Sequence, residues 1–224
     1  MTTEIHKLSL GICNCYLVKE EGLVIVDAGP PNQVSKLRME LQTLSIDPQD
    51  ISLMLITHGH YDHIGSVNAV KALTNCKVAI NHHEKEWLEQ ALRPMPPGIG
   101  IWGAVLSVLM HGMTPFMKFP ASSVDISLED KEFPLHPFGI NGKVLYTPGH
   151  TSGSMSLLLE TGEAFVGDLA MNGLPMRIGP GMPSVGDNRN TIKESWKLLL
   201  DSGAKWIYPA HGNPFPADVL KEAL

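Results

Sequence analysis

Residues 51–63, ISLMLITHGHYDH, join an almost wholly apolar run to a cluster of three histidines and one aspartate. The run Ile51–Ile56 is typical of a strand that is buried on both faces. The cluster therefore predicts a loop at the end of that strand, and Gly59 lets this loop fold back tightly where a side chain would obstruct it. Because imidazole and carboxylate groups are common metal ligands, the stretch predicts a metal site.

Three more ligand-type residues follow predicted strands farther along the chain. The candidate ligand set is His58, His60, Asp62, His63, His150, Asp168 and His211. His58 and His60 can aim at one ion, whereas Asp62 and His63 continue the turn and can reach a second ion ~3.5–4 Å away, as in hydrolytic two-metal centres. Seven such residues are enough for two ions and a bridging carboxylate.

The rest of the chain alternates between strand and helix patterns. Strands are predicted at 5–10, 15–19, 23–27, 77–81, 143–147, 155–159, 164–166 and 206–208, and helices at 34–44, 66–73, 83–92, 191–200 and after Pro216. A hairpin-rich start, a helix and a further strand recur in each half. This pattern predicts an α+β fold in which two sheets pack face to face with helices outside, a four-layer α/β/β/α sandwich, in a single domain over residues 1–224.

Two segments depart from this alternation of strand and helix patterns, and both are expected to lie over the predicted metal site. They are an apolar insertion at about 94–122 and a Gly-, Pro- and Met-rich loop at about 172–189. Met95–Met117 contains no Asp, Glu, Lys or Arg, but prolines and glycines interrupt it, so it is too broken for a membrane span. The insertion could cover an apolar or acyl part of a substrate, pack as a lid helix or form a homodimer contact.

Charge and cysteine content narrow the function classes. The formal net charge is −6, with 17 Lys and Arg against 23 Asp and Glu, so no basic surface for nucleic acid is expected. The N-terminal residues show no pattern of a secretory leader. Cys13, Cys15 and Cys76 are an odd number and imply no disulfide framework, so a reduced, cytoplasmic protein is expected.

Five motifs together resemble the metallo-β-lactamase-fold hydrolase superfamily over nearly the whole chain. They are VIVDAG at 24–29, HGHYDH at 58–63, TPGHT at 147–151, FVGD at 165–168 and PAHG at 209–212. The resemblance implies the metallo-β-lactamase fold. It also implies that one ion is bound by His58, His60 and His150, the other by Asp62, His63 and His211, and that Asp168 bridges the two.

This ligand set implies a dinuclear metal-dependent hydrolase. Two divalent ions, zinc foremost with iron or manganese as alternatives, would lower the pKa of a shared water from ~15.7 towards ~7 and so provide hydroxide at neutral pH. The expected substrate is a small molecule with an ester, thioester or lactone carbonyl. Asp62 is the candidate catalytic residue, because it could steer the hydroxide or return a proton to the leaving group. Asp27, at the end of an apolar strand, is expected to orient a ligating imidazole.

Two alternatives belong to other classes. A mononuclear iron persulfide dioxygenase would use His58, His150 and Asp168 as its triad, and a non-catalytic binding module would keep the fold without the chemistry. Lactonases of this superfamily commonly carry a tyrosine shortly after the bridging aspartate, whereas Asp168 is followed by Leu-Ala-Met-Asn. His82 and His83 are expected to be exposed residues at a helix start whose side chains diverge, not a metal pair.

Overall fold

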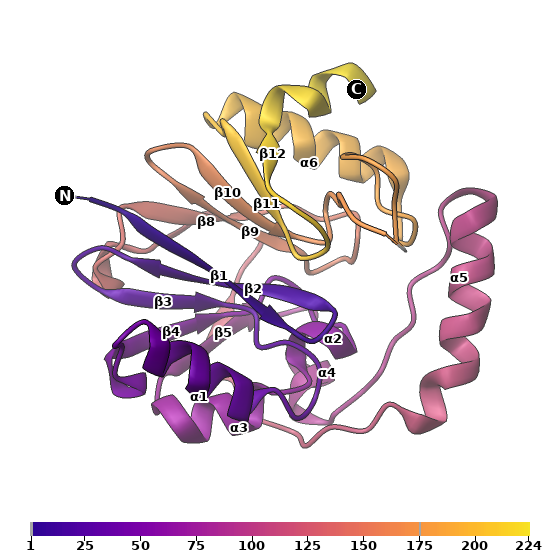
Figure 1. The fold of residues 1–224 in the computed structure, drawn as a ribbon. Coiled ribbons are helices and arrows are strands. Elements are labelled where there is room, and N and C mark those ends of the chain that lie inside the picture. The colour runs from indigo at the N-terminus through magenta and orange to yellow at the C-terminus, as the bar shows by residue number, and fades with distance from the viewer. Residues whose placement is uncertain (1, 175) are drawn as a thin grey trace.

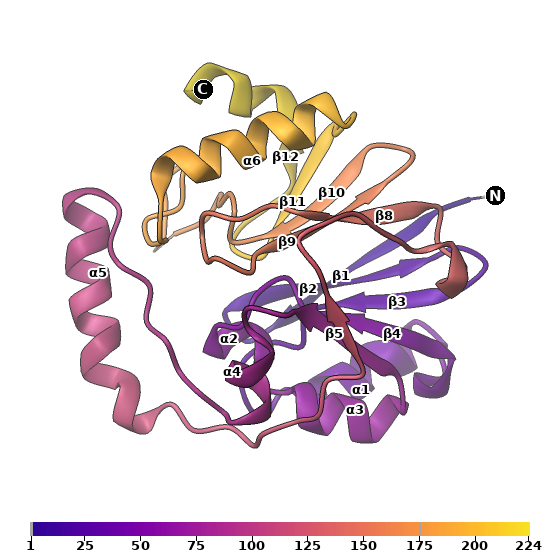
Figure 2. The same cartoon turned by 180° about the vertical axis from the view of Figure 1, so that it is seen from behind.

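Two six-stranded sheets pack face to face in the computed structural model, which describes residues 2–174 and 176–224. Helices cover the outer face of each sheet (Figures 1 and 2). The predicted four-layer α/β/β/α sandwich is therefore confirmed. That residues 1–224 form a single domain stays a prediction.

The first sheet combines an antiparallel start with a parallel end. Its strand order is β1-β2-β3-β4-β5-β6, with antiparallel pairing from β1 to β3 and parallel pairing from β3 to β6. The strands are β1 (Glu4–Leu10), β2 (Cys13–Lys19), β3 (Leu23–Val26), β4 (Ile51–Leu55), β5 (Lys77–Asn81) and β6 (Ile126–Leu128). β4 is central and ends directly before the histidine cluster, as predicted.

The second sheet has the order β12-β11-β10-β9-β8-β7, in which only β10 and β11 are parallel. Its strands are β7 (Phe133–Pro134), β8 (Gly142–Tyr146), β9 (Met155–Leu159), β10 (Glu163–Gly167), β11 (Trp206–Pro209) and β12 (Phe215–Pro216). Sequence patterns missed β6, β7 and β12, because two or three residues are too few to establish a period.

Three apolar clusters fill the spaces between the four layers. β3 shows how one strand serves two of them, because successive side chains of a strand point to opposite faces. Leu23 and Ile25 pack with the outer helices, whereas Val24 and Val26 face the second sheet. A strand buried on both faces has no need of polar alternation, which is why the runs in β3 and β4 are continuously apolar.

The helices are α1 (Val34–Thr43), α2 (Tyr61–Ile64), α3 (Val67–Thr74), α4 (Lys85–Glu89), α5 (Gly100–Met113) and α6 (Arg189–Asp201). α1 and α3 contribute to the outer cluster of the first sheet, and α6 to that of the second. Short 3-10 turns are η1 (Pro48–Asp50), η2 (Thr114–Phe116), η3 (His136–Phe138) and η4 (Ala217–Ala223). The helix predicted for 83–92 is thus shorter, and the terminal helix is of the 3-10 type.

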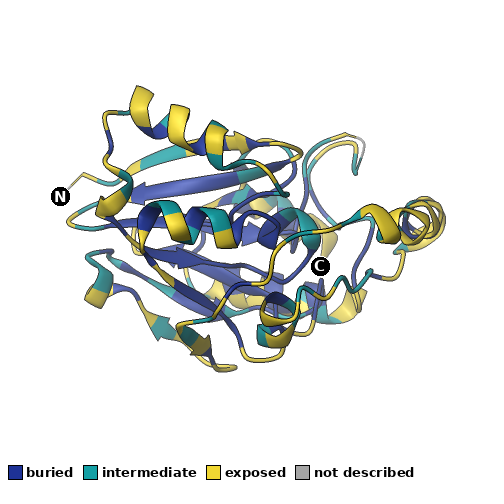
Figure 3. Cartoon of the chain, turned by 90° about the horizontal axis from the view of Figure 1, so that it is seen from below, coloured by how far each residue is buried: buried dark blue, intermediate teal, exposed yellow. Residues whose placement is uncertain are grey.

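α5 occupies the middle of the predicted apolar insertion. Figure 1 shows it at the edge of the molecule, joined to the sandwich by long arms, and its outward surface is largely exposed (Figure 3). No helix in the described part of the chain is long and apolar enough to cross a bilayer. That this segment covers the metal site stays a prediction.

Candidate metal centre

The seven candidate ligands lie in loops that leave strands of both sheets. His58, His60, Asp62 and His63 follow β4 or lie in α2, His150 follows β8, and Asp168 and His211 follow β10 and β11. The first of these loops is tightly packed. A Cβ at Gly59 would lie 2.7 Å from Trp87 Cε3, which supports the expectation that only glycine fits there.

One half of the centre contains His58, His60 and His150. Their candidate ligand atoms all lie within 4.8 Å of one another, and all three residues are buried. His150 Nε2 is 3.0 Å from His60 Nδ1. In tetrahedral coordination with bonds of ~2.0–2.1 Å, neighbouring ligand nitrogens are ~3.4 Å apart. The group could therefore hold one metal ion.

The other half contains Asp62, His63 and His211, whose candidate ligand atoms satisfy the same criterion. His211 Nε2 is 3.2 Å from Asp62 Oδ2. Asp168 lies between the halves. Its Oδ2 is 3.6 Å from His150 Nε2, whereas its Oδ1 is 3.4 Å from His211 Nε2. Each half of the centre thus has one oxygen of the same carboxylate.

Buried polar atoms without a hydrogen-bond partner gather at this point. In the described part of the chain there are five such side-chain atoms, of which one is Arg177 Nε and four are His58 Nε2, His63 Nε2, His211 Nε2 and Asp168 Oδ1. An unpaired buried polar group costs about 1–3 kcal/mol, so four in one cluster require a common partner. A divalent cation fits this donor set.

Hydrogen bonds at the far side of the rings fix which nitrogen faces the centre. His63 Nδ1 donates to Asp27 Oδ2 at 2.8 Å, the contact expected for Asp27. His150 Nδ1 donates to the carbonyl of Val185 and His211 Nδ1 to that of Ile12, both at 3.0 Å. A ring that donates through Nδ1 keeps the Nε2 lone pair for a metal.

Burial and charge act on these groups in opposite directions. Burial lowers the pKa of His58 and His150, and that of His60 to about 3, which favours the neutral imidazole that binds metals. Burial also acts to lower the pKa of His211, but the carboxylates of Asp168 and Asp62 outweigh it and raise that pKa. Asp62 and Asp168 therefore favour a positive charge on their side of the centre.

Sequence reasoning missed Glu84, a fully buried carboxylate that joins two of the ligand loops. Its Oε2 accepts a hydrogen bond from Gly59 N, between His58 and His60, and its Oε1 accepts one from Gly153 N at 3.1 Å, close to His150. Burial raises its pKa to about 7. In the sequence, Glu84 is visible only as a glutamate directly after His82-His83. Its two hydrogen-bond partners lie 25 and 69 residues away, so no local pattern indicates its role.

The expectation that His82 and His83 diverge is wrong. They precede α4, their ring centroids are 4.0 Å apart, and His83 Nε2 lies 3.0 Å from Asp130 Oδ2. All three residues are exposed, and their candidate ligand atoms lie within 4.8 Å of one another. The error arose because diverging directions apply within a helix, whereas these residues form a turn before one.

Comparisons with known proteins agree with this geometry. The model of the metallo-beta-lactamase superfamily matches residues 8–211. The "Probable metallo-hydrolase YqgX" of Bacillus subtilis is 27% identical over 212 residues, covering 92% of this chain and 87% of that protein.

Two solved structures share the fold. An archaeal metallo-beta-lactamase superfamily protein, ST1585 from Sulfolobus tokodaii, has a TM-score of 0.71 at 23% identity and is matched over 100% of this chain and 86% of that one. TTHA1623, solved in a di-iron-bound form, has a TM-score of 0.66 at 24% identity, with 96% of each chain covered.

Proposed function

The chain belongs to the metallo-beta-lactamase superfamily, and from this membership we propose that it is a dinuclear metal-dependent hydrolase acting on a small-molecule ester, thioester or lactone. The observation that carries the proposal is the convergence of four buried, unpartnered ligand atoms at one point. A structural cluster of histidines would satisfy its own polar atoms, because leaving them unpaired is costly.

The proposed ligand set divides into two triads and one shared carboxylate. The ligands are His58, His60 and His150 for one ion, Asp62, His63 and His211 for the other, and Asp168 for both. Imidazole with carboxylate suits zinc, and also iron or manganese. Zinc is the metal that we propose.

Bound divalent ions would act as Lewis acids and lower the pKa of a water molecule, which is the chemistry that ester hydrolysis requires. The chain itself contributes orientation and a carboxylate that can accept a hydrogen bond from the water. Asp62 is the most exposed of the carboxylates here, with 16% of its side chain accessible against 6% for Asp168. Substrate is therefore expected to approach from the Asp62 side.

Asp62 is also suited to orient the attacking water. Burial acts to raise its pKa, but His63 and His211 outweigh burial and lower the pKa to about 2, so the side chain is a carboxylate at neutral pH. A carboxylate at the mouth of the centre can accept a hydrogen bond from the attacking water and so orient it.

Elemental analysis tests the proposal. Protein purified without added metal should contain two divalent ions per chain, and it should hydrolyse at least one of a panel of aryl esters, lactones and acyl thioesters. His60→Ala and Asp168→Ala should lose both metal and activity, whereas His136→Ala, which changes an exposed histidine outside the cluster, should lose neither.

Three outcomes would contradict the proposal. Turnover by a metal-free His60→Ala protein would remove the mechanism. One iron per chain with oxygen consumption on a persulfide substrate would favour the dioxygenase alternative. Protein that retains no metal and turns over none of the panel would favour the binding module.

A further inference from the structure

The outward face of α5 is apolar and exposed along its whole length. Ile101 is 89% exposed and Val108 72%, and Phe116 in the following turn is 82% exposed. The apolar side chains exposed on this helix and turn are Ile101, Trp102, Val105, Val108, Leu109, Met113 and Phe116. Leu174 and Ile178, on the neighbouring loop, are also exposed. We name these nine side chains the α5 surface.

The inward face of α5 is held firmly by small residues. A Cβ at Gly103 would clash with the carbonyl oxygen of Ser184, and Ser107 Oγ donates to Pro96 O at 2.8 Å. Ile99 N donates to Ser184 O at 2.7 Å at the start of the helix. These contacts fix which side of the helix faces away from the sandwich. The α5 surface therefore cannot be buried by rotating the helix.

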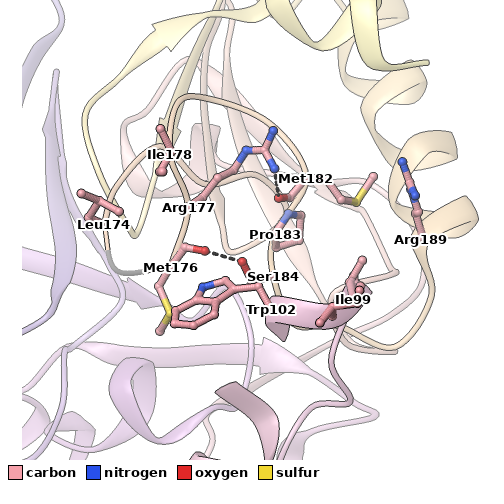
Figure 4. A pocket seen from close by; sticks show the side chains of 12 residues that line it. Ile99, Trp102, Leu174, Met176, Arg177, Ile178, Met182, Pro183, Ser184 and Arg189 are labelled. Atoms are coloured by element: carbon pink, nitrogen blue, oxygen red, sulfur yellow. Dashed lines mark hydrogen bonds between the residues drawn. The ribbon is translucent and has the colours of Figure 1, made fainter. Parts of the chain in front are cut away.

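A hollow lies beside the ridge that the exposed side chains of α5 form. A cavity of about 630 Å³ is lined by Ile99, Ile101 and Trp102 at the start of α5 and by residues of the neighbouring loop, among them Leu174, Met176 and Ser184 (Figure 4). Arg177 and Arg189 also line it, and no candidate metal ligand does. A surface that carries both a ridge and a hollow can be complementary to itself through a two-fold axis.

The composition of the α5 surface argues against a lipid bilayer as its partner. Helices that lie in a membrane interface carry Lys and Arg on a polar face, but Met95–Met117 contains no charged residue. The net charge of −6 also opposes anionic lipid. With 14 residues, α5 is only ~21 Å long and cannot span a bilayer.

A protein interface fits the same features. Interface centres are depleted of charge and enriched in aromatic residues and Met, with Arg also favoured. An aliphatic side chain of this size buries on the order of 100 Å², and an aromatic one more. The α5 surface can therefore supply roughly the 800 Å² per partner that a specific interface needs.

We propose that the α5 surface is a homodimer interface whose occupant is a second copy of this chain. The two α5 helices pack antiparallel about a two-fold axis, so that Leu109, Met113 and Phe116 of each copy enter the hollow of the other. The segment before α5 is also joined to the segment beside the candidate metal centre, because Gly186 N donates to Pro97 O and His150 Nδ1 donates to the neighbouring Val185 O.

Sedimentation velocity of the full chain tests this proposal independently of any activity. The wild-type protein should sediment at micromolar concentration with twice the 24.4 kDa mass of one chain. Leu109→Lys should raise the dimer dissociation constant by on the order of a hundredfold or more, because each copy would bury an ammonium group in a hollow that Arg177 and Arg189 of the other copy already line. Met39→Lys is the matched control, since Met39 on α1 and Leu109 are both 60% exposed.

A second variant separates loss of the dimer from loss of the fold. Phe116→Ser removes apolar area without adding charge, and it should weaken dimerisation while the thermal melt of the chain stays cooperative. A wild-type chain that remains monomeric throughout the micromolar range would overturn the proposal, as would a Leu109→Lys protein that dimerises as well as Met39→Lys. Monomeric protein that floats with phosphatidylcholine vesicles through α5 would also overturn it, in favour of a lipid surface.

Discussion

Glu84→Gln is the substitution that most directly separates loop positioning from metal ligation. The side chain keeps its size, and none of the seven candidate ligands is changed. Glutamate offers two acceptor oxygens, and the structure uses one for Gly59 N and the other for Gly153 N. Glutamine offers one, so its NH₂ group must face one of these two buried donors whichever way the amide is turned.

The expected loss of stability follows from the loss of that one acceptor oxygen. A buried N–H without a partner costs about 1–3 kcal/mol, which for a chain of this size corresponds to a fall in Tm of about 2–4 °C per kcal/mol. The two donors flank the loops of His58, His60 and His150. Groups that orient ligands typically change metal affinity 10–100-fold, so we expect a loss of that size.

A competition titration with a chromophoric chelator measures the affinity directly. Glu86→Gln supplies the control, because Glu86 is an exposed glutamate on α4 and the chemical change is identical. If Glu84→Gln bound metal within twofold of Glu86→Gln, the claim that Glu84 positions the two loops would be refuted.

Three further predictions concern neighbouring groups. Asp27→Asn should weaken metal binding 10–100-fold, since the hydrogen bond to His63 Nδ1 loses its charged acceptor; unchanged chelator competition would contradict this. Gly59→Ala should lower the free energy of unfolding by about 1–3 kcal/mol, because its Cβ would lie 2.7 Å from Trp87 Cε3, and an unaltered urea midpoint would disprove it. Burial raises the pKa of Glu84 from 4.5 to about 7, so the folded chain keeps a proton that the unfolded chain has lost between these pH values. As the pH rises from about 4.5 to 7, the free energy of unfolding of chelator-treated wild type should therefore fall by on the order of 3 kcal/mol relative to that of Glu84→Gln. An equal difference in free energy of unfolding between the two proteins at both pH values, measured by urea denaturation, would argue against this prediction.

The sequence predicted the layers of the fold because their signals are local. Apolar runs such as Ile51–Ile56 reveal a strand within a few residues, and ligand-type residues after such runs mark loops at strand ends. Glu84 escaped detection for the opposite reason, since its role depends on Gly59 and Gly153 meeting in space. α5 lies in the segment whose prolines and glycines argued against a membrane span, and a packed helix was one of the alternatives that the sequence left open there. Gly103 is required there by close contact with Ser184, and that contact cannot be read from the segment itself.

The candidate ligands are shared between the two sheets, four on the first and three on the second, and they extend from residue 58 to residue 211. During synthesis, the complete donor set cannot exist until the polypeptide has left the ribosome beyond His211 and the two sheets have docked. Acquisition of the proposed ions would then follow docking of the two sheets, and a chain interrupted before His211 would lack one of the seven candidate donors.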